Sequence, residues 1–468
     1  MNFPGQIEDS VLPLAGPLPA EQPAEPSCLY RWTVLLVVGL AMGCNYYVYD
    51  SINPLEHIFI ARLGFTATDF GWLNSAYAVT AVLTLLVGGV VIDRFGSKRA
   101  IAFFAVLCCL GATLTAAYGS PASMITGRAV LGLGGESMVV AATTAIARWF
   151  KGKELSFAFG IKIALARVMS VAADNSPSWA HRAYYPENLH GAPSWRAPLL
   201  IGAAAGLLAI LCSGLYWMLE SWAERRYQCK EVETRRQPRR FSEVFRLGPS
   251  YWLAVGICFA FYSAIFPFRT FAIDFLTNKL MLANGGFQAN EAMRVLAHKQ
   301  AGMFTSLLPL SAMFVTPLLG LLSDKIGRRA SLMLFAAVLL MPVYLLLGYT
   351  DVPPFIPLCM MGVAFAVMPA VIWSSVAYIV DPRQLGTAYA LMTLIEQIGF
   401  FAMNLLIGKV NDARHAGLGN VEGYRLGMLV FTGLATWGLI CATVLLLREK
   451  GPHAFGLEEV TVDGPPAS

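Results

Sequence analysis

Long apolar stretches alternate with short polar connections along almost the whole chain. A helix that crosses a bilayer needs about 20 predominantly apolar residues, and the pattern predicts twelve such helices. They cover residues 31–52, 70–92, 100–117, 122–149, 156–177, 197–220, 250–275, 301–322, 331–350, 354–380, 387–409 and 424–447. The sequence therefore predicts an all-α membrane protein.

The composition agrees with a membrane protein. Hydrophobic residues make up 56% of the chain and charged residues only 13%, about half the charged share of a typical soluble domain. The polar segment before the first predicted helix lacks the short cationic stretch and cleavage site of a signal peptide, so we expect that helix to be retained. The nine cysteines show no metal-binding spacing, and we expect them to pack as small apolar residues.

Basic residues gather in alternate connections between the predicted helices. They occur at residues 94–99, 148–153, 225–246, 325–329 and 448–450. Because cytoplasmic loops carry the excess of Lys and Arg in membrane proteins, we expect these connections and both termini to face the cytoplasm. The net charge of +5 then follows from topology. We interpret the basic run at the midpoint as a solvated linker, and we expect no nucleic-acid partner.

A ten-residue segment that joins two helices occurs twice. The segment from Gly89 to Lys98 (GVVIDRFGSK) recurs from Gly320 to Arg329 (GLLSDKIGRR), 231 residues later (320 minus 89). Both copies resemble the GxxxD(R/K)xGR(R/K) loop of the major facilitator superfamily, with Ser97 where that pattern has a base. The resemblance implies a twelve-helix fold of two pseudo-symmetric six-helix halves that rock against each other.

The same resemblance divides the chain into five parts. We expect a disordered cytoplasmic tail over residues 1–30, a first half over 31–220, a cytoplasmic linker over 221–249, a second half over 250–447 and a cytoplasmic tail over 448–468. In the superfamily the repeated loop stabilises the outward-facing state, because its glycine lets two helices approach closely and its acid faces a helix terminus. The expected gating residues are Gly89, Asp93, Arg94, Gly96, Arg99, Gly320, Asp324, Arg328 and Arg329.

Charged residues inside the predicted spans are few, and each is costly to bury and tends to be paired or functional. Arg269 and Asp274 lie late in the seventh span, where we expect them to reach toward the aqueous interface. Glu136 and Arg167 lie near mid-membrane depth on adjacent helices, at a rise of about 1.5 Å per residue. They could bind a substrate, or they could pair with each other and hold the helices together. The charged residues within the spans are Asp50, Arg128, Glu136, Lys162, Arg167, Asp174, Arg269, Asp274 and Glu396.

Aromatic and polar residues of other spans are candidates to line a central cavity with these charges. Arg167 could hold a carboxylate by bidentate hydrogen bonds, and Glu136, Asp50 or Glu396 could receive an ammonium group. A cavity with both charge signs suits a zwitterion such as an amino acid or a short peptide. For the aromatic residues, helix packing or an interfacial belt is the alternative. The candidate substrate-binding residues are Glu136, Arg167, Tyr46, Tyr49, Asp50, Trp373, Tyr378, Glu396 and Gln397.

Six segments carry a narrower resemblance: residues 132–141 (GLGGESMVVA), 149–155 (WFKGKEL), 159–160 (FG), 166–167 (AR), 376–380 (VAYIV) and 384–389 (QLGTAY). They are similar to the dipeptide-carrier family of major facilitator superfamily domain-containing protein 1. The resemblance implies dipeptide transport by a uniporter, and it matches the family's substrate-contacting Glu and Arg to Glu136 and Arg167. The family's accessory subunit and lysosomal address are not carried over, because we find no sequence feature that calls for them.

The function favoured by the sequence is secondary transport of small zwitterionic solutes, most of all dipeptides. Proton-coupled symport, or export of organic anions, amino acids or drugs, is the alternative, and a membrane sensor without transport is a third hypothesis. An enzyme is disfavoured, since the chain shows no paired metal ligands, nucleophile elbow or phosphate-binding loop. We expect no catalytic residue, no metal and no cofactor.

The expected partners are a small-molecule substrate (a dipeptide or an amino acid), the lipid bilayer and, for symport, protons. No Asn-x-Ser/Thr acceptor for glycosylation occurs, which suits a bacterial inner membrane, and we expect a monomer. The external connections at residues 179–195 and 279–299 are either solvated surface or caps on the cavity.

Overall fold

The computed structural model describes residues 26–150, 155–186, 192–227, 247–283, 291–381, 384–452 and 454–459. All twelve predicted spans coincide with helices. Ten helical stretches of the described chain are long and apolar enough to cross a bilayer. The all-α membrane fold predicted from the sequence is therefore confirmed.

The first half of the chain forms six long helices joined by turns and short helices. The long ones are α1 (Cys28–Asp50), α3 (Ala67–Phe95), α4 (Ser97–Ala117), α5 (Pro121–Trp149), α6 (Leu155–Asp174) and α9 (Arg196–Tyr227). The short ones are η1 (Asn53–Leu55), α2 (Glu56–Leu63), α7 (Ser176–Trp179) and α8 (His181–Tyr184). Helix α9 continues seven residues past the predicted end of its span at residue 220, and residues 228–246 of the predicted linker lie outside the described residues.

The second half contains four uninterrupted long helices and two interrupted ones. The uninterrupted helices are α10 (Pro249–Ala283), α11 (Glu291–Ile326), α16 (Leu385–Ala413) and α17 (Arg425–Glu449), the last preceded by η5 (Val421–Tyr424). One interrupted span consists of α12 (Arg329–Leu340) and α13 (Val343–Tyr349), and the other of α14 (Phe355–Val367), the π-helical turn η4 (Met368–Ile372) and α15 (Trp373–Ile379). Pro342 and Pro369 lie at the two breaks, where the missing backbone N–H disturbs the helix.

Local sequence signals set the ends of the helices. A capping box begins α3, because the Asp69 N–H donates to the Thr66 hydroxyl and the Thr66 N–H donates to the Asp69 carboxylate, each at 3.0 Å. Gly96 and Gly327 follow α3 and α11 with φ of 80° and 68°, a region that glycine enters without a Cβ clash. These two glycines occupy the same position in the repeated segments, so in both halves a glycine with positive φ follows the helix.

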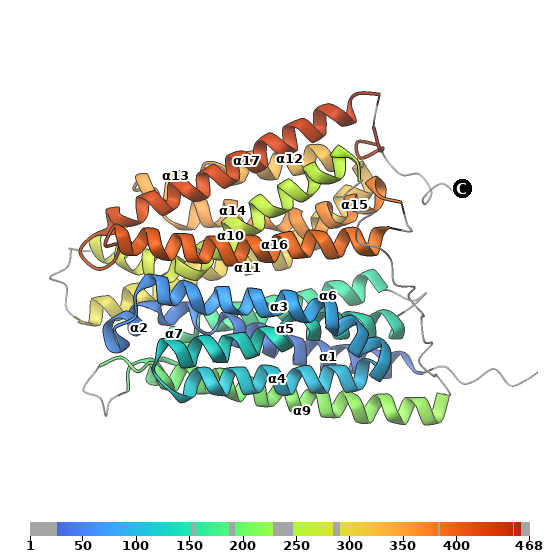
Figure 1. Ribbon diagram of the computed structural model, residues 1–468, viewed down its shortest axis with the longest axis horizontal. Helices are drawn as coiled ribbons and strands as arrows, with labels where there is room; N and C mark the ends of the chain where they lie inside the picture. Colours follow the sequence, from blue (N-terminus) through green and yellow to red (C-terminus); the bar gives the residue numbers. More distant parts are fainter. Residues whose placement is uncertain are drawn as a thin grey trace, which may run out of the picture.

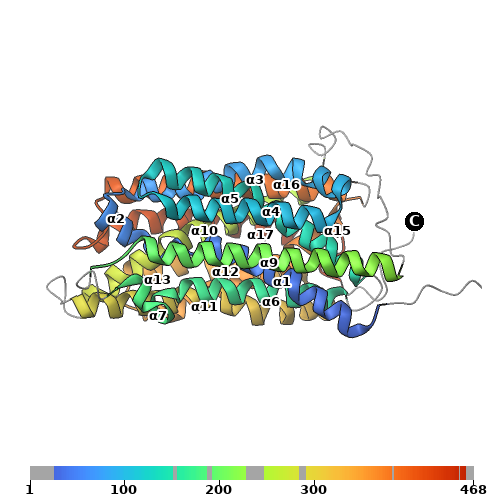
Figure 2. The same cartoon turned by 90° about the horizontal axis from the view of Figure 1, so that it is seen from below.

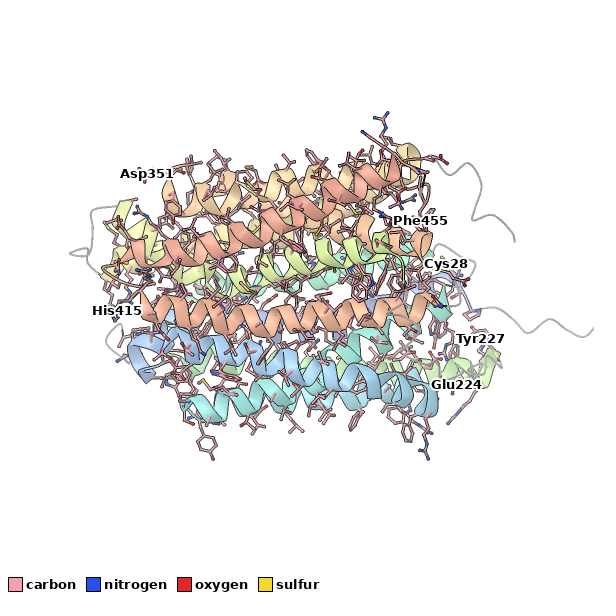
Figure 3. All side chains as sticks on the ribbon, turned by 45° about the horizontal axis from the view of Figure 1, so that its top comes forward. Cys28, Glu224, Tyr227, Asp351, His415 and Phe455 are labelled. Atoms are coloured by element: carbon pink, nitrogen blue, oxygen red, sulfur yellow. The ribbon has the colours of Figure 1, made fainter. Side chains whose placement is uncertain are left out.

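The two halves lie side by side along the length of the long helices (Figure 1). Across their boundary α3 packs on α16 and α6 packs on α11, as the view from below also shows (Figure 2). We call the end that carries Cys28, Tyr227 and Phe455 the terminal end, and the opposite end, with Asp351 and His415, the distal end (Figure 3).

Buried apolar side chains join the two halves at the distal end. One buried cluster consists only of first-half residues. The other combines second-half residues with first-half residues from the distal parts of their helices and connections, such as Leu55, Phe70 and Leu199. The distal end is therefore one core shared by both halves.

A helix cap between the halves reinforces this closure. Asp412, at the distal end of α16, accepts hydrogen bonds from the N–H groups of Ala67 and Thr68 at 2.8 Å each. These groups belong to the first turn of α3, where unpaired N–H groups and the helix dipole favour an anion. The second half thus caps a helix of the first.

The connection at residues 179–195 also takes part in the closure, so it is not simply solvated surface. Tyr184 is fully buried, and the Tyr185 hydroxyl lies 2.9 Å from Nδ1 of His298 in the second half. Nε2 of His298 donates to the Pro54 carbonyl at 2.8 Å, because a carbonyl only accepts. Burial raises the pKa of Tyr185 to about 12, so its hydroxyl keeps its proton and can donate to Nδ1.

Part of the predicted carboxyl-terminal tail packs on the bundle at the terminal end. Leu457 is fully buried, and its carbonyl accepts from the Arg329 N–H at 2.6 Å. The Glu449 carboxylate accepts from the Leu457 N–H at 3.1 Å, and the Glu458 carboxylate accepts from the Ser331 N–H at 2.7 Å. This segment ties the end of α17 to the beginning of α12.

Candidate functional site

A cavity of about 250 Å³ lies between the two halves. Its walls come from α1, α3, α5 and α6 on one side and from α10, α15 and α16 on the other. The lining residues are Asn45, Tyr46, Tyr49, Tyr77, Glu136, Val139, Val140, Arg167, Tyr262, Phe266, Trp373, Thr393, Glu396, Gln397 and Phe400. Such a volume suits a solute smaller than a typical drug molecule.

Two carboxylates face this cavity from opposite halves. Glu136 on α5 accepts a hydrogen bond from the Tyr77 hydroxyl at 3.2 Å. Glu396 on α16 is 8% exposed and lines the same cavity from the second half. A cationic group placed in the cavity would be attracted by both carboxylates.

Arg167 on α6 supplies the positive charge of the cavity wall. Its guanidinium carbon lies 5.8 Å from the ring centroid of Tyr46 and 5.2 Å from that of Phe365, so aromatic faces of both halves hold it. Within the described residues Arg167 forms no ion pair, and Glu136 bonds Tyr77 instead. The direct Glu136–Arg167 pair considered from the sequence is therefore absent from this part of the structure, and the guanidinium is available to an anion.

The structure brings most of the predicted substrate-binding residues to one place. Those on the cavity wall are Glu136, Arg167, Tyr46, Tyr49, Trp373, Glu396 and Gln397. Asp50 and Tyr378 are not on it. The sequence indicated which helices surround the centre, because the depth of a residue in a span follows from its position along the helix.

Asp50 lies at the distal end and not at the cavity, which corrects its predicted role as an ammonium ligand. It is the last residue of α1, and its carboxylate accepts from Arg269 on α10 at 2.7 Å. The same guanidinium donates to Asp174, the last residue of α6, also at 2.7 Å. All three side chains are at least 96% buried. We call Asp50, Arg269 and Asp174 the distal triad.

The expectation that Arg269 and Asp274 reach the aqueous interface is also wrong. Asp274 is 4% exposed and accepts from the Tyr424 hydroxyl and from the Asn278 amide. Both charges found partners on neighbouring helices, which a buried charge requires.

Tyr378 lies at the terminal end, so its predicted place on the cavity wall is wrong. The guanidinium carbon of Arg329 stands 4.2 Å from the centroid of its ring. Arg329 is itself 2% exposed, whereas Arg94, Arg99 and Arg328 are exposed. Of these predicted gating residues, Arg329 is therefore buried against an aromatic ring and the other three arginines are exposed.

The glycines that begin the two repeated segments make no close helix contact in this structure. A Cβ added at Gly89 or at Gly320 would meet nothing within 4 Å. Among the described residues, neither glycine thus makes the close approach expected from the sequence. The side chains of Asp93 and Asp324, the acids of the two segments, lie outside the described residues.

The sequence analysis missed several residues of the cavity wall. Tyr77 on α3 holds Glu136, and Tyr262 on α10 accepts from the Trp373 indole N–H at 3.3 Å. Thr393 precedes Glu396 by one helical turn on the same face. Tyr77 lies three residues after Asn74, so these two polar positions share one face of a largely apolar span, and that pattern could have drawn attention to them.

Comparison with known proteins gives a consistent result. A family model described as Major Facilitator Superfamily matches residues 38–403 and 280–461. The lysosomal dipeptide transporter MFSD1 of Danio rerio is 29% identical, over 90% of this chain and 87% of the relative, and that of Homo sapiens is 28% identical, over 93% and 90%. Among solved structures, the nucleoside transporter NupG is similar with a TM-score of 0.66 at 14% identity, covering 89% of this chain and 99% of that one. The last likeness concerns the fold alone.

Proposed function

The chain belongs to the major facilitator superfamily and is a membrane transport protein, and we propose that it carries dipeptides by alternating access. One observation carries the proposal: an arginine without an ion pair among the described residues shares a cavity with two carboxylates. The similarity to proteins named lysosomal dipeptide transporter MFSD1 supports the same substrate class.

The charges of the cavity match the two ends of a dipeptide. Arg167 would hold the terminal carboxylate in a bidentate contact, and Glu136 or Glu396 would receive the terminal ammonium. Gln397 and Asn45 offer amide groups for the peptide bond between these ends. A monocarboxylate would engage Arg167 only and leave both acids facing each other, so it should bind more weakly.

The terminal end is proposed to face the cytoplasm, as the distribution of basic residues predicts. The structure would then be the state that is closed on the outer side. For coupling we propose uniport, in which the dipeptide gradient sets the direction of transport. The membrane that holds the protein, predicted to be a bacterial inner membrane, remains a prediction.

Liposome uptake of labelled dipeptides, with and without an imposed pH gradient, tests the proposal. We expect saturable uptake at the same rate in both conditions. Replacement of Arg167 by Ala or of Glu136 by Gln should lower kcat/KM by about 10-fold or more, since a charge-assisted contact contributes roughly 1.5–3 kcal/mol.

Two matched variants control for general damage to the protein. Val168→Ala changes the residue next to Arg167 on the exposed side of α6, and Glu422→Gln removes an exposed carboxylate at the distal end. Both should transport like the unmodified protein. Uptake that survives Arg167→Ala would refute the assignment of the site, and uphill accumulation driven by the proton gradient would replace uniport by symport.

A further inference from the structure

Arg128 on α5 is a buried charge to which the proposed binding mode gives no role. Its side chain is 1% exposed. Nη2 donates to the Asn74 side-chain oxygen at 2.6 Å, and Nη1 donates to the Tyr49 carbonyl at 3.1 Å. Its hydrogen-bond partners in the described structure are neutral, although a buried cation is normally paired with a carboxylate. A charge placed at such cost calls for an explanation other than stability.

On one side, Arg128 supports two aromatic rings of the cavity wall. Its guanidinium carbon lies 4.9 Å from the centroid of Tyr49 and 5.6 Å from that of Tyr77. The two ring centroids are 4.6 Å apart. Because the Tyr77 hydroxyl bonds Glu136, the guanidinium fixes the ring that positions a carboxylate proposed to bind substrate.

On the other side, Arg128 reaches the boundary between the two halves through Asn74. Arginine only donates, so the oxygen of the Asn74 amide must face it and the amide NH₂ must point away. That NH₂ donates to the Thr270 hydroxyl on α10 at 3.1 Å. Thr270 directly follows Arg269 of the distal triad. One turn of α10 therefore carries both the hydrogen bond to Asn74 and the ion pairs of the triad with the first half.

We propose that Arg128 is a positioning residue that couples the cavity to closure of the distal end. The identity of the ligand rests on the proposed function, and the coupling rests on the contacts of Arg128 and Asn74 described above. When the distal end opens, α10 must leave α3, and the Asn74–Thr270 hydrogen bond must break. Asn74 then loses one of its two restraints, and the guanidinium, the two rings and Glu136 lose their common alignment. The Glu136 side of the cavity is therefore best organised when the distal end is closed. By linkage, a ligand that binds this side better in the closed state favours that state.

The test measures the distal end directly and needs no ligand. Spin labels at Ala61→Cys on α2 and Ala413→Cys on α16, two exposed positions on opposite halves at the distal end, report the opening as a longer label-to-label distance. The labels are placed in a cysteine-free background that still transports, in lipid nanodiscs. Thr270→Val removes the hydroxyl that accepts from Asn74 while preserving shape. Thr277→Val is the matched control, because that buried hydroxyl donates to Ile273 within its own helix.

We expect Thr270→Val to raise the ratio of open to closed distal populations by about fivefold, the effect of one hydrogen bond, and Thr277→Val to leave the ratio unchanged. Tyr77→Phe, which cuts the cavity end of the same network, should raise the ratio as well. The double variant should raise it by less than the product of the two single effects, because both act through Arg128. Arg128→Lys keeps the charge but loses the planar set of N–H donors of the guanidinium. In that background, Tyr77→Phe should no longer change the ratio of open to closed distal populations.

Independent effects that multiply in the double variant would overturn the proposal, and so would a Tyr77→Phe protein with an unchanged distal ratio. In the presence of a dipeptide, the unmodified protein should shift toward the closed distance and the Arg128→Lys protein should not. If the dipeptide shifts neither protein while the ligand-free cycle shows coupling, the proposed substrate fails and the coupling through Arg128 stands.

Discussion

The distal end and the terminal end use glycine in opposite ways. At the distal end, glycines bring the backbones of the two halves together: a Cβ added at Gly408 would lie 2.6 Å from the Ala67 carbonyl oxygen, and one at Gly71 or Gly302 would collide with backbone atoms of the other half. At the terminal end, Gly89 and Gly320 have open space around them. The open space at these two glycines leaves room for the close helix contact that the proposed alternating access would make there.

The two ends also differ in how the sequence presents them. The terminal loops are a repeated motif, and the distal closure depends on residues without such a repeat, among them Arg269, Asp412 and the asparagine–threonine pair. A repeated motif indicates what both halves share, while closure of one end needs two unlike surfaces that fit each other. The repeated motif, the strongest sequence signal in this chain, therefore marks the end where Gly89 and Gly320 have open space around them.

Removal of the shared guanidinium should affect the distal end most. Arg269→Leu leaves two buried aspartates without their cation, a change that costs about 3–5 kcal/mol in a buried pair. We expect the spin-label distance at the distal end to lengthen in most molecules. Arg425→Leu is the matched control, because Arg425 pairs with Glu422 on the exposed surface and such a pair contributes about 0–1 kcal/mol.

A rescue variant separates loss of the latch from damage to the fold. When Asp50→Asn and Asp174→Asn are combined with Arg269→Leu, no buried charge remains and the closed distance should return in part. If Arg269→Leu alone keeps the short distance, the distal triad does not hold the end closed.

Adding one methyl group should have opposite results at the two ends. Gly408→Ala presses Cβ against a backbone carbonyl and should disfavour distal closure by about 1–3 kcal/mol, the usual range for overpacking. Gly89→Ala should leave the distal distance unchanged, since its Cβ meets open space. It should nevertheless slow dipeptide uptake if Gly89 makes its close contact in the other state. Equal effects of both variants on the distal distance would remove the contrast between the ends.

The helix cap between the halves should have the smallest effect of the three. Asp412→Asn keeps one acceptor oxygen for the first turn of α3 but loses the second, because Ala67 and Thr68 donate to different oxygens. It also loses the negative charge, which contributes about 0.3–1 kcal/mol at a helix N-terminus. We expect a twofold to fivefold rise in the open distal population at low salt, and less at high salt, because ions screen the interaction. Asp69→Asn makes the same chemical change in a cap within the first half, and it should leave the ratio as it was.

Much of the fold could be predicted from the sequence because the signal is local. A span of apolar residues of bilayer length indicates a helix whatever its neighbours are, so each of the twelve spans was found. Depth along a helix also follows from residue number, which is why Glu136, Arg167 and Glu396 were expected near one level. The prediction that these residues share a cavity used only this depth and the order of helices that the repeat implies.

The partners of the buried charges could not be predicted in this way. Asp50 and Arg269 are separated by 219 residues, and nothing in the local sequence of either indicates the other. Each lies near the end of a predicted span, so contact with water was the simpler expectation. Which of two solutions a charge near a helix end adopts depends on the face that the neighbouring helix presents, and that is a property of tertiary packing.

The sharing of one guanidinium has a consequence for leakage. Arg269 binds the last residue of α1 and the last residue of α6. If one of these helices leaves α10, its carboxylate loses the guanidinium, while the carboxylate of the other helix keeps it. A gap beside only one of the two helices would admit water to the distal triad while the other ion pair is still formed. Release of both helices together would keep partly open forms rare, and a carrier that lacks such forms would admit few other solutes or ions across the membrane.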